Sequence, residues 1–410
     1  KEEDIMKKFN KVLSVVVASA MVMAMAGCGN TDNGSAATGT NAATESAAAD
    51  NGAASGSVFK IGGIGPTTGG AAVYGLAVQH GAEIAVEEIN AAGGINGYQV
   101  EFKFQDDEAD AEKSVNAYNA LKDWGAQIID GSTTSGACIA VTDKTKEDNM
   151  FQITPSGSAV ECVQYDNNFR VCFSNPNQGL ASAQYIGENG LAEKIAVIYD
   201  SSDVYSSGIY EKFVKEAENQ PFEVVAAEAF TADNKTDFSV QLQKAKDAGA
   251  DMVFLPIYYQ ESALILTQAA AMGYAPKWFS CDGMDGILGG VDNFDVSLTE
   301  GVMLLTPFAA DATDDLTQSF VTKYKEKYGE TPNQFAADSY DAIYVIKAAI
   351  EKSGVTPDMS VSDICDGMKA AMTEITVDGL TGNGMTWTAD GEANKAPKAV
   401  VIENGAYKAM

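Results

Sequence analysis

The chain has 410 residues, more than one hydrophobic core usually serves, so two domains or lobes are expected. Its formal net charge of −30 argues against a nucleic-acid partner, because phosphate binding needs clustered Lys and Arg. His80 is the one histidine of the chain and the cysteine spacings match no zinc pattern, so we expect no metal and no cofactor.

The N-terminus reads as a targeting segment. Three lysines between residues 7 and 11 precede an apolar run over 12–26 that is short for a membrane span. The run ends in Ala-Gly-Cys28, which resembles a bacterial lipoprotein signal, and an ordinary cleaved signal peptide is the alternative. We therefore predict a lipoprotein signal peptide over 1–27 and lipidation of Cys28. The protein would then be extracytoplasmic and anchored to the cell membrane.

A low-complexity stretch follows over 28–56, where Ala, Gly, Ser, Thr and Asn leave almost no apolar bulk. Such a composition cannot bury enough surface to fold and predicts a flexible tether. Strands and helices alternate beyond it, which is typical of an α/β fold with parallel sheets. Strands are expected over 58–61, 100–104, 128–129, 150–153, 169–173, 195–199, 223–230, 252–257, 277–280 and 302–305. Helices are expected over 72–92, 110–124, 137–148, 261–272, 316–328, 336–352 and 361–372.

Turn-forming residues in the sequence predict where the chain turns or passes from one lobe to the other. Asn96-Gly97 is a hairpin-type turn, Ser174 to Asn177 reads as a break, and 384–388 with 399–403 is expected to form a closing hairpin. Breaks near 175, 306 and 379 predict two Rossmann-like lobes joined by a three-crossing hinge. Lobe 1 would comprise 57–175 and 307–379, and lobe 2 would comprise 176–306 and 380–410. A ligand can be enclosed between lobes that close about such a hinge.

Two loops rich in hydroxyl groups follow neighbouring predicted strands. Residues 130–136 follow the strand over 128–129, and 154–158 follow the strand over 150–153. Strands joined by a helix are usually parallel neighbours, so both loops should lie at the carboxyl edge of one sheet, where open α/β sheets bind ligands. Each loop leads towards a helix N-terminus, which attracts anions. The pair therefore suits a small carboxylate, and the alternative is that these serines only cap helices.

Two further side chains follow later strands. Asp282 offers a negative charge for an ammonium group, and Tyr258 offers an aromatic wall, so with the hydroxyl loops they suit an amino-acid zwitterion. The alternative for Asp282 is a turn or calcium-like aspartate, given Asp285 and the flanking glycines. Catalysis by a serine triad would need His80, which has no orienting acid nearby in sequence, and G-x-S-x-G does not occur. We expect that the protein is not an enzyme.

Several motifs together resemble a known family over about Val58 to Lys408. The resemblance is to the type I periplasmic binding proteins, in particular the leucine/isoleucine/valine-binding proteins of ABC importers, here in a bacterial lipoprotein form. The motifs are Ile61-Gly-Gly-Ile-Gly-Pro66 with Tyr74-Gly75, Glu87-Glu-Ile-Asn-Ala-Ala-Gly-Gly-Ile-Asn-Gly97, Gln105-Asp-Asp107, Ile153-Thr-Pro-Ser-Gly-Ser158, Phe169-Arg170 and Asp282-Gly283.

The resemblance implies roles for eight ligand-binding residues. Ser135 falls where the family binds the ligand carboxylate, and Ser156 and Ser158 fall where it uses a backbone carbonyl for the ammonium and a hydroxyl for the carboxylate. Asp282 falls where an acid binds the ammonium. The aromatic positions, one near the ammonium and three shaping the side-chain pocket, are Tyr258, Tyr74, Tyr205 and Phe335.

The resemblance also leaves points open. A disulfide of some members has no counterpart, since Thr134 stands at one of its positions, and the cysteines beyond Cys28 are Cys138, Cys162, Cys172, Cys281 and Cys365. A local Cys162–Cys172 bridge and buried thiols are both open. The implied function is delivery of an amino acid, branched-chain above all, to an ABC permease by a monomer. Alternatives are the same fold binding urea, a short amide or an aromatic acid, a sensory ligand-binding module, and a structural surface protein.

Overall fold

The computed structural model describes residues 56–410. The predicted signal peptide over 1–27, the predicted lipidation site Cys28 and all but the last residue of the predicted tether lie outside the described residues. Within that part of the chain, no helix combines the length and the apolar character needed to cross a membrane.

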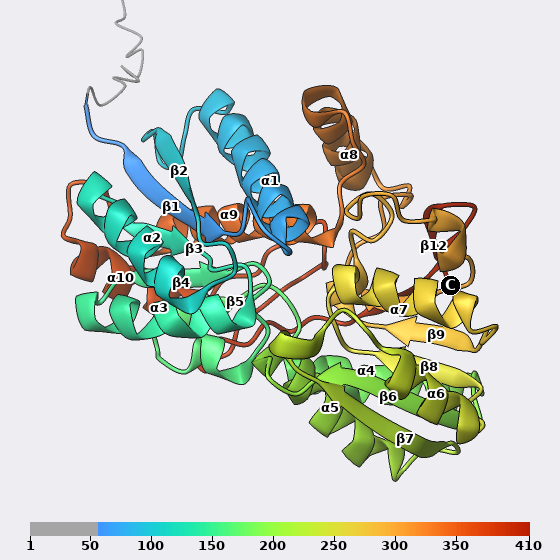
Figure 1. Cartoon of the computed structure of the whole chain (residues 1–410). Coiled ribbons are helices and arrows are strands. Elements are labelled where there is room, and N and C mark those ends of the chain that lie inside the picture. The colour runs from blue at the N-terminus through green and yellow to red at the C-terminus, as the bar shows by residue number, and fades with distance from the viewer. Residues whose placement is uncertain (1–55) are drawn as a thin grey trace, which may run out of the picture. The chain divides into compact units, whose positions relative to one another are not determined.

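The strands within residues 59–170 form a five-stranded parallel sheet in the order β2-β1-β3-β4-β5 (Figure 1). Side chains of β3 alternate between its faces: Ile128 packs in the core cluster that holds α1, and Ile129 in the cluster with α2 and α3. Helices therefore cover both faces of the sheet. The bounds are β1 Phe59–Gly65, α1 Ala72–Ala91, β2 Val100–Asp106, α2 Ala111–Trp124, β3 Ile128–Asp130, α3 Ser135–Asp148, β4 Phe151–Thr154, the 3-10 helix η1 Val160–Val163 and β5 Asn168–Arg170.

The second sheet has seven strands in the order β12-β11-β10-β9-β8-β6-β7. The strands β6 to β10 pair in parallel, and β11 and β12 add an antiparallel edge. The bounds are α4 Asn175–Glu188, β6 Lys194–Asp200, α5 Val204–Ala217, β7 Glu223–Phe230, η2 Ala232–Asn234, α6 Ser239–Asp247, β8 Met252–Leu255, α7 Tyr259–Ala271, β9 Lys277–Ser280, η3 Asp282–Met284, η4 Val296–Thr299, β10 Met303–Thr306, β11 Lys398–Glu403 and β12 Ala406–Ala409.

Between β10 and β11 the chain returns to the first sheet through α8 (Asp315–Tyr328), α9 (Gln334–Ser353) and α10 (Val361–Met372). Helix α9 packs on α1 and on β3 and β4, and α10 packs on α9 and β4. The chain thus passes between the two sheets three times, which confirms the predicted fold class.

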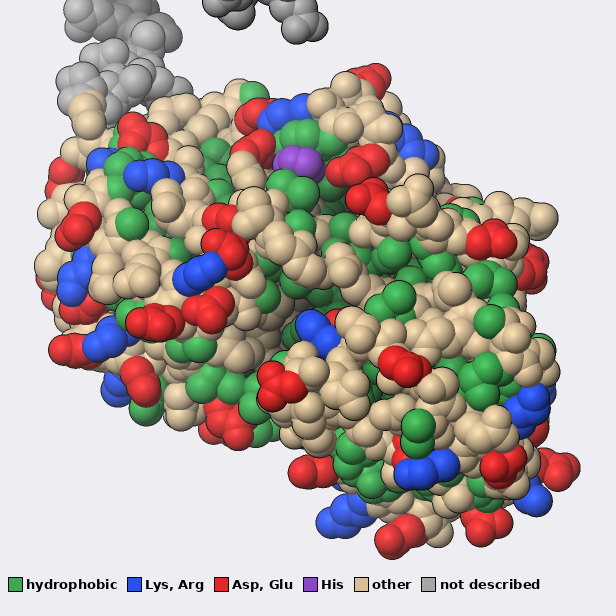
Figure 2. Space-filling model, in the orientation of Figure 1, with side chains coloured by type: hydrophobic (Ala, Val, Ile, Leu, Met, Phe, Trp, Pro, Cys, Tyr) green, Lys and Arg blue, Asp and Glu red, His purple; other side chains and the backbone are tan. Residues whose placement is uncertain are grey.

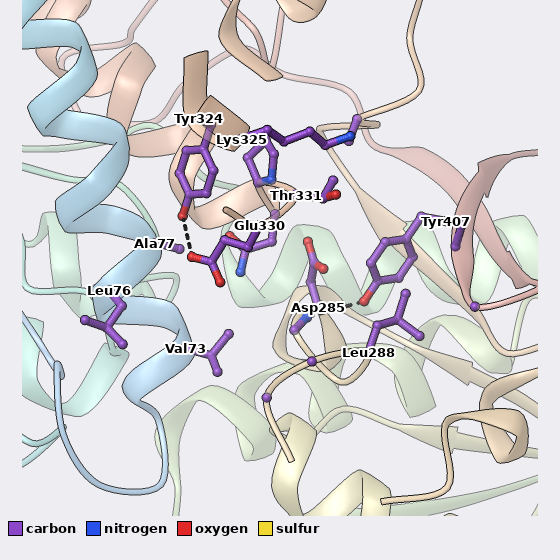
Figure 3. A pocket seen from close by; sticks show the side chains of 18 of the residues that line it. Val73, Leu76, Ala77, Asp285, Leu288, Tyr324, Lys325, Glu330, Thr331 and Tyr407 are labelled. Atoms are coloured by element: carbon purple, nitrogen blue, oxygen red, sulfur yellow. Dashed lines mark hydrogen bonds between the residues drawn. The ribbon is translucent and has the colours of Figure 1, made fainter. Parts of the chain in front are cut away.

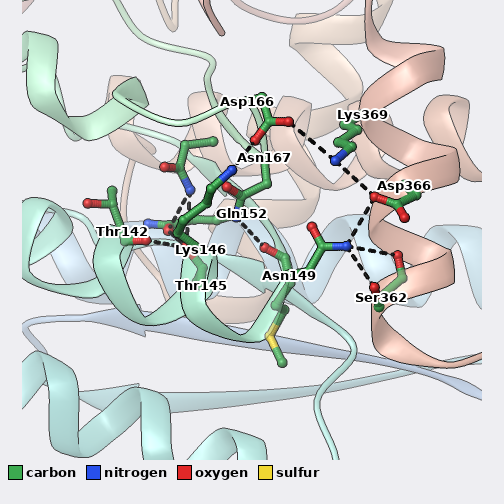
Figure 4. Close-up of polar contacts among 12 residues, drawn as sticks. Thr142, Thr145, Lys146, Asn149, Gln152, Asp166, Asn167, Ser362, Asp366 and Lys369 are labelled. Atoms are coloured by element: carbon green, nitrogen blue, oxygen red, sulfur yellow. Dashed lines mark hydrogen bonds and ion pairs between the residues drawn. The ribbon is translucent and has the colours of Figure 1, made fainter.

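A polar network fastens the returning helix α10 to α3 (Figure 4). Asn149 Nδ2 donates to Ser362 Oγ at 2.7 Å and to Asp366 Oδ1 at 3.0 Å. Lys369 Nζ lies 2.8 Å from Asp366 and 3.3 Å from Asp166. Because Asn149 and Asp166 precede β4 and β5, these contacts bind a late segment of the chain to the amino edge of the first sheet, opposite the edge that carries the hydroxyl loops.

Two local predictions were wrong. The break expected over Ser174 to Asn177 is the first turn of α4, where the Ser174 hydroxyl accepts from the Asn177 N–H and Pro176 occupies a position that needs no donor. The strand before it, β5, ends at Arg170 and not at Phe173.

The expected hairpin between 384–388 and 399–403 does not form. Strand β11 pairs instead with β12, across Asn404 and Gly405, whose φ values of 52° and 71° are those of the tight hairpin turn that Asn-Gly favours. Residues 384–388 take part only in isolated bridges, Val377 with Met385 and Trp387 with Ala393. The turn was readable in the sequence, but Ala406–Ala409 is short and mostly exposed and carries little strand signal.

The surface mixes both signs of charge. Figure 2 shows Lys side chains scattered among the more numerous acidic ones on the face in view. His80, the purple side chain, stacks on Tyr328 with ring centroids 3.6 Å apart, and its Nδ1 lies 3.3 Å from the Tyr324 hydroxyl. Burial lowers the pKa of His80. It therefore joins α1 to α8 as a packing residue.

Candidate functional site

The two hydroxyl loops meet at the carboxyl edge of the first sheet, as predicted. Strands β3 and β4 pair in parallel, so the loops that follow them lie side by side. Ser135 Oγ accepts from the backbone N–H groups of Ser158 at 3.2 Å and Ala159 at 3.1 Å, and lies 3.5 Å from Ser158 Oγ. Ser156 Oγ donates to Thr133 O at 2.6 Å. The three predicted serines are therefore buried members of one hydrogen-bonded unit.

Arg170, at the end of β5, fixes the position of this serine unit by hydrogen bonds to its backbone. Its side chain is fully buried, and its guanidinium donates to the carbonyls of residues 157–159 at distances of 2.6 to 3.3 Å. A segment from near the chain end holds Arg170 in turn: its N–H donates to Gly391 O at 3.0 Å, and Trp387 Nε1 donates to its carbonyl at 2.8 Å. Because the loop carbonyls point at the cation, the loop keeps one conformation. The sequence motif marked Arg170, but its role as a positioning residue was missed.

Asp282 begins η3 after β9 and is buried. Its Oδ1 accepts from the Tyr205 hydroxyl at 2.6 Å and its Oδ2 from Gln178 Nε2 at 2.8 Å, while its carbonyl accepts from Gln334 Nε2 at 3.2 Å. Burial raises the pKa of Asp282 to about 7, against the lowering effect of the Tyr205 and Gln178 hydrogen bonds, and the Asp338 carboxylate raises it further. The carboxylate is thus poorly compensated by its surroundings.

Four aromatic rings gather around this carboxylate. Tyr74 packs against Phe335 with centroids 4.4 Å apart and meets the edge of Tyr258 at 5.5 Å. Tyr258 stacks on Tyr205 at 5.0 Å. The Tyr74 hydroxyl, from α1 beside the first sheet, donates to Gly283 O in η3 beside the second. The aromatic cluster therefore spans the two sheets next to Asp282.

The structure accordingly gathers the eight predicted residues into two groups. The serine group comprises Ser135, Ser156 and Ser158, and the acid and aromatic group comprises Asp282, Tyr74, Tyr205, Tyr258 and Phe335. Within residues 56–410, no hydrogen bond joins a member of one group directly to a member of the other. Sequence reasoning missed Gln178 and Gln334, whose amides orient Asp282. A glutamine in a helix carries no signal of that role.

The five described cysteines are all buried and unpaired, so the local bridge between Cys162 and Cys172 does not form. Cys162 packs instead in a small cluster with Cys138 and Ala159 behind the hydroxyl loops. Burial raises the pKa of Cys162. In the part of the chain that the structure describes, no group of three His, Cys, Asp or Glu side chains is placed to hold a metal ion.

Comparison with known proteins agrees with this architecture. Residues 58–406 match the sequence profile described as periplasmic binding protein. "Leu/Ile/Val-binding protein homolog 3" of Brucella melitensis is 31% identical over 300 residues, which cover 73% of this chain and 80% of the relative. A Pseudomonas aeruginosa protein named "Leucine-, isoleucine-, valine-, threonine-, and alanine-binding protein" is 30% identical over 303 residues, 72% of this chain and 79% of the relative.

Solved structures share the fold. The branched-chain amino acid transporter substrate binding protein LivJ of Streptococcus pneumoniae, solved with isoleucine, superposes with a TM-score of 0.77 at 28% identity over 86% of this chain and 99% of that one. A solute binding protein of R. palustris in complex with benzoate gives a TM-score of 0.76 at 20% identity over 86% and 95% of the two chains, which shows the shared fold alone. With the two sheets, the three crossings and the profile match over 58–406, the chain belongs to the periplasmic binding protein family, in its type I fold.

Proposed function

We propose that this protein captures a branched-chain amino acid between its two lobes and delivers it to the permease of an ABC importer. One observation carries the proposal: Asp282 is a buried carboxylate that forms no ion pair with any cation of residues 56–410. Its protein partners there are neutral donors. A buried charge is normally paired, so the ammonium group of an amino acid would supply the missing partner.

The serine group suits the other end of the zwitterion. Ser135 begins α3 and Ser158 lies shortly before η1, where hydroxyl groups and the positive end of a helix favour a carboxylate. Ser156 would contribute its backbone carbonyl to the ammonium, as the family resemblance implies. The Arg170 guanidinium donates to the carbonyl groups of residues 158 and 159, on one side of the second hydroxyl loop. The opposite side of that loop therefore remains free for the ligand. In this arrangement the ligand lies between the two groups of site residues.

The aromatic side chains support an apolar ligand body. Tyr74, Phe335 and Tyr258 present ring surface and no charge, which suits an aliphatic side chain. Benzoate, the ligand of one structural neighbour, carries no ammonium group and would leave Asp282 unpaired. Urea or a short amide would use Asp282 as a hydrogen-bond acceptor but would not engage an anion site. We therefore favour the amino acid over these ligands.

The lobes of the proposal are 57–175 with 307–379 and 176–306 with 380–410, closing about the three crossings. The names of two solved structures, one a branched-chain amino acid transporter substrate binding protein and one a solute binding protein of an ABC transporter, support an ABC importer as partner. The proposed anchor is Cys28, whose lipid chain would hold the body, as a monomer, at the outer face of the membrane. The family is one of binding proteins, which accords with the expectation that the chain is not an enzyme.

Thermal melting and titration calorimetry of residues 57–410 test the proposal against leucine, isoleucine, valine, benzoate, urea and acetamide. A branched-chain amino acid at about a hundredfold excess over its dissociation constant should stabilise the protein by about 2.7 kcal/mol. Asp282→Ala should weaken that binding by about 2–5 kcal/mol, the range for unpairing a buried charge. Stabilisation by benzoate or acetamide alone would reject the zwitterion, and no shift with any of the six would reject the proposal.

A further inference from the structure

A second cavity lies outside the predicted amino-acid site. Its volume is about 510 Å³, and the eight predicted ligand-binding residues are absent from its lining. Four parts of the body enclose it, with Tyr407 of β12 closing one side. They are the first turns of α1, the segment over 285–290 after η3, residues 310–311 before α8, and the end of α8 with the residues that follow it. Figure 3 shows side chains from these elements converging on one space. The volume is within the usual range for small-molecule sites.

Asp285 is the polar centre of this cavity. Its side chain is 4% exposed, and Oδ2 accepts from the Gln334 N–H at 2.9 Å. Oδ1 has no hydrogen-bond partner among the described residues. The Tyr407 hydroxyl accepts from the Gly286 N–H at 3.3 Å and lies beside the Asp285 carboxylate, but it does not meet Oδ1 with hydrogen-bond geometry. Burial raises the pKa of Asp285, against the lowering effect of the Gln334 N–H and the nearby Tyr407 hydroxyl. Figure 3 shows the carboxylate directed into the cavity, so a ligand donor there would satisfy this oxygen.

The charged residues that line the cavity determine whether it favours a cationic or an anionic ligand. Three acidic residues, Asp285, Asp311 and Glu330, face one basic residue, Lys325, around the cavity. Among residues 56–410, none of the four forms an ion pair with another or with any further lysine or carboxylate, and Glu330 lies 3.6 Å from Nδ1 of His80. The field in the cavity therefore favours a cation over an anion.

The opposite wall is apolar and open. Val73, Leu76 and Leu288 line it, and Leu76 is one of the exposed large hydrophobic side chains of the body. A Cβ atom at Gly290 would meet a Val73 methyl group at 2.6 Å, so this glycine allows α1 to approach the 285–290 segment. Gly289 also lines the cavity, but a Cβ atom there would meet nothing within 4 Å. A short hydrocarbon chain thus has a wall to pack against.

We propose that this cavity is a second binding site, for an organic cation that carries a primary ammonium group on a short aliphatic chain. The ammonium donates to Asp285 Oδ1, and the chain packs on Val73, Leu76 and Leu288. The lining of the site includes residues of α1 and of β12. Helix α1 packs on β1 and β2 of the first sheet, and β12 belongs to the second sheet. Its ligand therefore contacts elements of both sheets and would stabilise their arrangement.

Titration calorimetry with hexylammonium, hexanol and hexanoate, three ligands with one chain and three headgroups, tests the proposal at neutral pH. Hexylammonium should bind with one-to-one stoichiometry, and hexanol and hexanoate should bind at least about tenfold more weakly, the difference expected for one charge-assisted hydrogen bond. Absence of hexylammonium binding up to about 10 mM, or equal binding of hexanoate, would overturn the proposal.

Three variants locate the binding. Asp285→Asn keeps an acceptor for the Gln334 N–H and should weaken hexylammonium binding at least about tenfold. Gly289→Leu fills the cavity from a position with free space and should block binding without touching Asp285. Asp282→Asn alters the predicted amino-acid site and should leave hexylammonium binding unchanged. Loss of binding in the Asp282 variant, or its retention in both of the others, would place the cation elsewhere and reject the second site.

Discussion

Replacing Asp282 by asparagine should stabilise the ligand-free protein at neutral and alkaline pH. Burial raises the pKa of Asp282 to about 7, whereas an aspartate in an unfolded chain titrates near about 3.9. Below the lower value both states are protonated and the buried group carries no penalty. As the pH rises to 7, only the unfolded state gains a charge, at about 1.4 kcal/mol per pH unit. The native state therefore loses on the order of 4 kcal/mol of stability over this range.

Asparagine removes that loss at a small structural cost. Its oxygen still accepts from the Tyr205 hydroxyl, but its amide group faces Gln178 Nε2, a donor, so Gln178 must turn its own amide. The lost or weakened hydrogen bond costs about 1 kcal/mol. The variant should thus be less stable than the natural protein by about 1 kcal/mol near pH 4 and more stable by on the order of 3 kcal/mol near pH 8.

Urea unfolding of residues 57–410, followed by tryptophan fluorescence at several pH values, measures this crossover. Asp123→Asn, at an exposed aspartate with no hydrogen-bond partner among the described residues, is the matched control and should follow the natural protein at every pH. A stability difference that does not change with pH, or an Asp282 variant less stable than the natural protein at pH 8, would refute the reasoning. Calorimetry on the same sample should show that amino-acid binding is lost.

Three other changes test the shell around the site. Tyr205→Phe removes a donor to Asp282, so the ligand's affinity, measured by calorimetry, should fall about tenfold, and an unchanged affinity would contradict the role of that bond. Arg170→Met removes three guanidinium hydrogen bonds from the carbonyls of 157–159, of which Ser158 O and Ala159 O keep backbone donors, and should lower the free energy of unfolding by about 3 kcal/mol in urea, which a fully stable variant would disprove. Lys395→Met leaves the buried carboxylate of Asp338, 2.7 Å from the lysine Nζ, without its cation. The native protein should lose about 3–5 kcal/mol of stability, measured by thermal unfolding. Adding Asp338→Asn should recover most of the lost stability. A double variant as unstable as Lys395→Met would show that packing of the lysine side chain dominates.

Local signals in the sequence predicted most of the first sheet and the grouping of the site. Helix α2 begins after Asp110 and ends at Gly125, as a capping aspartate and a terminal glycine require. The hydroxyl loops were predicted as neighbours because a helix joins β3 to β4, and their strands do pair. Asp282 was predicted from its place after a strand and from the family resemblance. These features are readable because they depend on short stretches of chain.

The rest depends on contacts between distant segments. A lone arginine at the end of a strand looks like a surface charge, and the burial of Arg170 appears only when Trp387 packs against it, 217 residues later. Gln178 is likewise 104 residues from Asp282. The cavity around Asp285 was not foreseen either, because its walls come from five separate parts of the chain.

The way β5 is held has a consequence for the order in which the molecule can be built. The edge strand of the first sheet takes its outer partners from Trp387 and Gly391, close to the last residue of the chain. An N-terminal portion released before them would carry the Arg170 strand without these bonds. The first sheet therefore gains its full set of native hydrogen bonds only when residues 387–391 are present, although its five strands all lie within 59–170.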